Sequence, residues 1–166
     1  MKKLIIIATV ALMASVSSAA SFAWKTSGIK GVEGSDTFTG SAILTAYVAG
    51  TDTVIGTWEQ TITDGKVAGS SSGYTISSDD FVGGSKYDFI FVATTTYEGK
   101  EYEYVSTTKA GVTAQATSTP SLSWFAANHT TGENINANGW AAVPEPTSGL
   151  LMLVGLAGLA LRRRHA

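Results

Sequence analysis

A two-residue alternation in the middle of the chain most limits the folds that it can adopt. In residues 24–142, runs rich in Val, Ile, Thr, Tyr, Phe and Trp are separated by short glycine- and serine-rich segments, and no window has a sustained 3.6-residue period. Branched and aromatic residues favour pleated strands, whereas glycine and serine clusters mark turns. Strands roughly ten residues apart are typical of sandwiches and open barrels. The sequence therefore predicts an all-β domain, either an antiparallel sandwich or an open barrel.

The expected strands are the runs that have turn signals on both sides. They cover residues 37–38, 42–48, 53–63, 74–77, 87–97, 101–108, 112–117 and 123–127. The run 42–48 is apolar on both faces, which predicts a central or doubly covered strand.

The best-specified element is a hairpin over residues 87–108. A loop at Glu98 and Gly99 sets three cross-strand pairs, which are Tyr97 with Lys100, Thr95 with Tyr102, and Ala93 with Tyr104. A slip of one residue would exchange the two faces of the hairpin, so the alternation sets the register. One face then collects the aromatic side chains Tyr87, Phe89, Phe91, Tyr97, Tyr102 and Tyr104.

The aromatic face of this hairpin has two interpretations. Aromatic rows on strands mostly line a core, so we expect this face, with Trp58 of the preceding run, to lie inside the domain. The alternative is an exposed platform that stacks on sugar rings, with Tyr102, Tyr104 and Trp58 as the glycan contacts. Full burial of Tyr102 and Tyr104 would exclude the alternative.

The carboxyl-terminal tail differs from the β-rich middle. Pro144 and Pro146 fix their own φ angles and keep the residues before them out of helix. An uncharged run follows over residues 149–161, and as a helix it would be about 20 Å long against a bilayer core of about 30 Å. Three arginines end the run, and the positive-inside bias places them in the cytoplasm. We expect a short transmembrane helix at 149–161, with the rest of the chain outside; a buried core helix is the alternative.

In order, spacing and terminal position, this tail resembles the PEP-CTERM sorting signals. The resemblance covers residues 143–165 and rests on Pro144-Glu145-Pro146, the apolar run, and the cytoplasmic stop Arg162, Arg163 and Arg164. It implies recognition by an exosortase, a membrane-embedded cysteine protease-transpeptidase of Gram-negative bacteria that make exopolysaccharide. The resemblance further implies a cut at or near Pro-Glu-Pro, after which the domain passes outward.

The amino-terminal end has the pattern of a Sec signal peptide. Lys2 and Lys3 precede an apolar run over residues 4–16, and small residues follow. Small residues at positions −3 and −1 allow cleavage after Ala19, Ala20 or Ala23, and we expect it after Ala23. A retained amino-terminal anchor is the alternative.

The expected organisation is therefore a signal peptide (1–23), a β-sandwich-like exported domain (24–127), a polar Asn- and Gly-rich linker (128–142) and the sorting signal (143–166). The full chain has a net charge of −2, but residues 24–142 contain six lysines, twelve acidic residues and no arginine, which gives −6. Binding to nucleic acid needs a basic surface, so we exclude it. The chain has no cysteine, so disulfides and a cysteine nucleophile are excluded as well.

Catalysis has little support in the sequence. His129 is the one histidine of residues 24–142, it lies in a polar run, and no Gly-x-Ser-x-Gly elbow surrounds any serine. Glu101 and Glu103 share a strand face, as a pair for glycoside hydrolysis would need, but a solvated face is the commoner explanation. We expect no catalytic residues, no metal ligands and no cofactor.

Three functions remain at this point. The favoured one is a non-enzymatic protein of the cell surface or extracellular matrix that associates with exopolysaccharide. Its expected partners are the Sec machinery and the exosortase, both transient, and the membrane through the carboxyl-terminal helix. The alternatives are a small carbohydrate-binding module and, less favoured, a carboxylate-dependent enzyme acting on glycosides.

Overall fold

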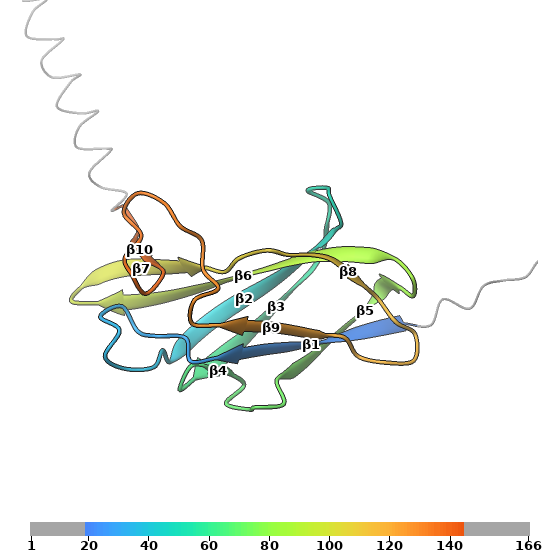
Figure 1. The fold of residues 1–166 in the computed structure, drawn as a ribbon, viewed down its shortest axis with the longest axis horizontal. Coiled ribbons are helices and arrows are strands. Elements are labelled where there is room, and N and C mark those ends of the chain that lie inside the picture. The colour runs from blue at the N-terminus through green and yellow to red at the C-terminus, as the bar shows by residue number, and fades with distance from the viewer. Residues whose placement is uncertain (1–18, 145–166) are drawn as a thin grey trace, which may run out of the picture.

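A computed structural model describes residues 19–144 of the chain. This part consists of ten strands and no helix (Figure 1). The strands are β1 (Ala19–Ser27), β2 (Gly40–Val48), β3 (Val54–Thr63), β4 (Lys66–Val67), β5 (Tyr74–Val82), β6 (Lys86–Tyr97), β7 (Lys100–Val105), β8 (Lys109–Thr113), β9 (Ser121–Phe125) and β10 (Trp140–Ala142). The all-β prediction is confirmed.

The strands form two sheets, and neither closes into a barrel. The short sheet has the order β5-β1-β9, and the long sheet has the order β10-β7-β6-β2-β3-β4, with β8 paired to β6. The run 42–48 becomes the inner strand β2, between β3 and β6, as its apolar faces predict. One pairing departs from the antiparallel expectation, because β1 and β9 run parallel, side by side in Figure 1. Parallel neighbours need a long connection, so local turn signals do not reveal them.

An aromatic core fills the space between the sheets. Phe22 and Trp24 of β1 face Phe89 and Phe91 of β6, with ring centroids 4.7 Å apart for Phe22–Phe89 and 5.8 Å apart for Trp24–Phe91. All four side chains are fully buried. Edge-to-face and tilted pairs such as these add to the stabilisation that burial provides.

The predicted hairpin is present with the predicted register. Tyr97 pairs with Lys100, Thr95 with Tyr102, and Ala93 with Tyr104. Its aromatic face lies mostly in the core, because Tyr87, Phe89, Phe91 and Tyr104 are all buried. The run 101–108 does not form one strand, since β7 ends at Val105 and β8 then pairs with the start of β6.

Ser106 marks the point where β7 ends. Its hydroxyl accepts the Phe91 N–H at 2.9 Å, and its own N–H donates to the Phe91 carbonyl oxygen at 2.9 Å. The side chain is fully buried, and its Oγ also donates to the Thr107 carbonyl oxygen at 3.2 Å. A buried serine therefore satisfies the backbone where the chain leaves the ladder.

Strand residues lie on both sides of the range 24–127 that is expected for the exported domain. β1 begins at Ala19, ahead of the expected start at residue 24. The stretch 128–142, expected as a linker, lies against the domain and contains β10. The remainder of the predicted signal peptide and the predicted helix 149–161 lie outside the described residues. Within residues 19–144, no helix is long and apolar enough to cross a membrane.

Candidate functional site at the carboxyl-terminal strand

The domain holds the chain in place up to the first proline of the predicted sorting motif. β10 pairs with β7, so that Trp140 opposes Tyr104 and Ala142 opposes Tyr102. The Val143 N–H then donates to the Glu101 carbonyl oxygen at 2.9 Å. Pro144 follows immediately, so no slack chain separates the folded domain from Pro144.

Trp140 anchors this last strand. Only 1 % of its surface is exposed, and its indole N–H donates to the Lys30 carbonyl oxygen at 2.8 Å. Its ring centroid lies 4.9 Å from that of Phe38 and 5.5 Å from that of Tyr104. A buried indole adds buried apolar area, and the hydrogen bond from its N–H sets the orientation of the ring. Trp140 therefore holds β10 in place on the sheet.

Asparagine side chains fold the polar segment before β10. The Asn136 amide donates to the Val32 carbonyl oxygen at 2.9 Å, and its Oδ1 accepts the N–H groups of Asn138 and Trp140 at 2.9 and 3.0 Å. Asn138 donates to the same Val32 oxygen at 3.1 Å. Asparagine bonds nearby backbone in this way without regular secondary structure. The polar composition that predicts a linker is also compatible with an ordered loop, and the buried Trp140 ties this segment to the domain.

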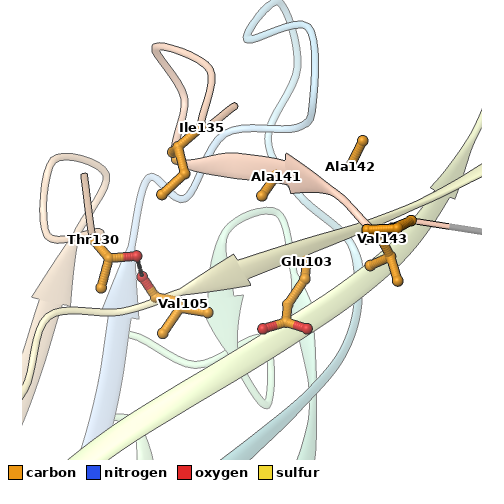
Figure 2. Close-up of a pocket in the computed structure, with 9 residues that line it drawn as sticks. Glu103, Val105, Thr130, Ile135, Ala141, Ala142 and Val143 are labelled. Atoms are coloured by element: carbon orange, nitrogen blue, oxygen red, sulfur yellow. Dashed lines mark hydrogen bonds between the residues drawn. The ribbon is translucent and has the colours of Figure 1, made fainter. Parts of the chain in front are cut away.

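A hollow lies beside β10, with a volume of about 200 Å³. Figure 2 shows Thr130 hydrogen-bonded to the Val105 carbonyl oxygen at one end and Val143 at the other. Most of the remaining lining is aliphatic or backbone, and Glu103 supplies the one carboxylate. Its lining therefore contains no second acid beside Glu103, and its one hydroxyl, that of Thr130, donates to the Val105 carbonyl oxygen.

The acidic and histidine side chains near this strand do not form a cluster. Glu101 is exposed and Glu103 is half-buried on the same strand, β7. His129, which lies in a polar run of the sequence, is half-buried; it forms a β-bridge with Ser106, and its ring lies 5.9 Å from that of Tyr104. Residues 19–144 contain no group of three or more His, Cys, Asp or Glu side chains that could hold a metal ion.

The three candidate glycan contacts do not form an exposed row. Tyr104 is fully buried, and this burial raises the pKa of its phenol to about 12. Trp58 is half-buried and stacks on Phe81, with centroids 5.5 Å apart. Tyr102 is half-buried beside the Tyr97 ring. Because Tyr104 is buried, the three side chains do not share one exposed surface.

A second hollow lies around Tyr102, near the end of the β6–β7 hairpin. Its volume is about 290 Å³, and Thr94, Thr95, Thr96, Glu101 and Val143 complete its lining. Alternation along the two strands places Thr95 on the same face as Tyr102, and Thr94, Thr96 and Glu101 on the other face. Hydroxyl and carboxylate groups of this kind can bond a small polar ligand.

The tail matches a known family model. The description of that model is the PEP-CTERM protein-sorting motif, and the match covers residues 142–164. No curated protein and no solved structure matches the chain. The match begins at Ala142, the last residue of β10. The chain therefore carries a PEP-CTERM sorting motif, joined directly to a folded β domain, and this motif marks it as an exported substrate of an exosortase.

Proposed function

We propose that this protein is a non-enzymatic component of the cell surface or extracellular matrix, released by an exosortase and associated with exopolysaccharide. The observation that carries the proposal is the sorting motif, which begins where β10 ends. The domain supplies a compact all-β body with no disulfide. Its excess of acidic residues suits solubility outside the cell.

Processing is proposed to follow the order that the tail implies. The chain is exported through the Sec machinery, the helix 149–161 holds it in the membrane, and Arg162, Arg163 and Arg164 remain cytoplasmic. The exosortase then cuts at or near Pro144-Glu145-Pro146. β10 is paired with β7, and the chain is held up to Val143. Few residues therefore separate the folded domain from the expected helix at 149–161, which keeps the domain close to the membrane where the exosortase acts.

Replacement of Pro144, Glu145 and Pro146 by alanine tests the sorting step. The variant should stay in the membrane fraction at its uncleaved size, measured by fractionation and immunoblot in a Gram-negative host that has an exosortase. Pro120→Ala is the matched control, since Pro120 is the one proline outside the motif, and it should be released like the wild type. Release of the triple variant at the normal size would contradict sorting by an exosortase.

A small carbohydrate-binding module is the second candidate, and the hollow at Tyr102 favours it. In this case the aromatic ring of Tyr102 would stack on a sugar while the hydroxyl of its cross-strand neighbour Thr95 bonds a sugar hydroxyl group. A glycan-array screen of the released protein tests this directly. Binding that is lost in Tyr102→Ala and kept in Tyr74→Ala, which changes a tyrosine on the other sheet, would support it. Hydrolysis of any bound glycan would instead point to an enzyme.

A further inference from the structure

The first half of β1 belongs to the core of the exported domain. Ala20, Phe22 and Trp24 are each no more than 1 % exposed. The Phe22 ring lies between the sheets, with its centroid 4.9 Å from that of Phe81 and 4.7 Å from that of Phe89. Both contacts are edge-to-face, so the ring fills a place that small side chains cannot occupy.

The backbone of this half-strand is equally engaged. β1 is the middle strand of the short sheet, and residues 21–23 pair with residues 75–77 of β5. The Ala23 N–H also donates to the Pro120 carbonyl oxygen at 2.8 Å. A chain that began at Trp24 would leave these β5 groups without partners and a void beside Phe89, and both are costly in a packed interior.

These contacts discriminate among the three cleavage positions that the small-residue rule allows. A cut after Ala23 discards Phe22 with the signal peptide, and a cut after Ala20 discards a buried methyl group. A cut after Ala19 keeps every buried residue of β1, because the Ala19 side chain is exposed. It places Ser17 and Ala19 at positions −3 and −1. We propose that signal peptidase cuts between Ala19 and Ala20, so that the mature protein keeps β1 from Ala20 onward.

A matched pair of substitutions tests the position of the cut. Valine is a good strand residue but too large for position −1, so Ala19→Val and Ala23→Val make the same change at two candidate sites. Ala19→Val should accumulate precursor, while Ala23→Val should be processed like the wild type, whose amino-terminal sequence should begin at Ala20. A mature sequence that begins at Ser21 or Trp24, or accumulation of precursor in Ala23→Val alone, would overturn the proposal.

Phe22→Leu provides an independent measurement on the mature exported protein. If Phe22 is part of that protein, its replacement should lower the unfolding temperature by about 4 °C or more, or abolish recovery of the exported protein. Phe125→Leu is the control, because Phe125 is 59 % exposed and should leave the unfolding temperature unchanged. A mature protein with wild-type stability in Phe22→Leu would show that Phe22 is discarded before folding.

Discussion

Asp88 of β6 joins the turn after β2 and the strand β8 through one carboxylate. Its Oδ2 accepts the Gly50 N–H at 2.8 Å, and its Oδ1 accepts the Gly111 N–H at 2.6 Å. The bond from Gly50, followed by that from Gly111, lowers the pKa of Asp88 below its usual value. Hydrogen bonds to a charged acceptor favour the charged form, so the carboxylate stabilises the fold only while it is ionised.

The effect of Asp88 should therefore depend on pH. A carboxylate with a lowered pKa stabilises the folded state above its unfolded pKa of about 3.9, and this contribution is lost as the pH falls through the folded pKa. At pH 7, Asp88→Asn should lower the free energy of unfolding by about 1 kcal/mol, reduced by solvent screening at this half-buried site. The difference from the wild type should disappear toward pH 2, as measured by urea denaturation.

Asp52→Asn is the control for this pH series. Asp52 is exposed and lies in the same turn region as Gly50. Its replacement should leave the unfolding free energy within about 0.5 kcal/mol of the wild type. An equal loss in both variants would mean that overall charge, and not the hydrogen bonds from Gly50 and Gly111, causes the effect.

Two hairpin turns have the same backbone conformation but different surroundings. Asp64-Gly65 and Glu98-Gly99 both have positive φ angles at two successive residues, with values of 72° at Gly65 and 75° at Gly99. Two-residue turns of this kind match the twist of the strands. A Cβ at Gly99 would meet open space, but a Cβ at Gly65 would lie 2.8 Å from the Ile29 backbone nitrogen.

Alanine at these two glycines should therefore have unequal costs. Gly99→Ala should lower the free energy of unfolding by about 1 kcal/mol, because only the left-handed backbone is strained. Gly65→Ala should lower it by about 2–3 kcal/mol, because backbone must also move. Urea midpoints of the two variants measure the difference. Equal losses of unfolding free energy would show that the backbone around Ile29 can move without destabilising the fold.

Elements defined by neighbouring residues were predictable, and those defined by distant contacts were not. The register of β6 and β7 follows from alternation around a two-residue loop, and the structure confirms it. β5 continues through Asp79 and Asp80 to Val82, beyond residue 77, where the expected strand ends. Phe81 explains the extension, since its fully buried ring packs against Phe22 of a strand far away in the chain.

At the scale of the whole molecule, the carboxyl-terminal segment closes one end of the sandwich. Figure 1 shows β10 beside β7 at the end of the molecule opposite the start of β1. Trp140 joins this segment to the connection between β1 and β2, through the Lys30 carbonyl oxygen and the Phe38 ring. The part of the chain nearest the sorting motif is therefore held by the earliest part of the domain.

Trp140→Ala should loosen this closure. Loss of a fully buried tryptophan should lower the free energy of unfolding by about 3–5 kcal/mol. Amide hydrogen exchange should also accelerate at Thr130 and Val143, whose N–H groups bond to Val105 and Glu101. The exposed Phe125 provides the control variant Phe125→Ala, which should change neither quantity. Unchanged exchange at Val143 in Trp140→Ala would mean that β10 holds its place without the indole.

By itself, the sequence determined the all-β class, the register of the long hairpin, and the sorting motif that the family model matches at residues 142–164. Each depends on residues that are close together in the chain. Only the tertiary structure decided the parallel pairing of β1 with β9, the docking of β10, and the place of Phe22 in the core. These depend on which distant side chains fill the same interior space, and neither alternation nor composition records that.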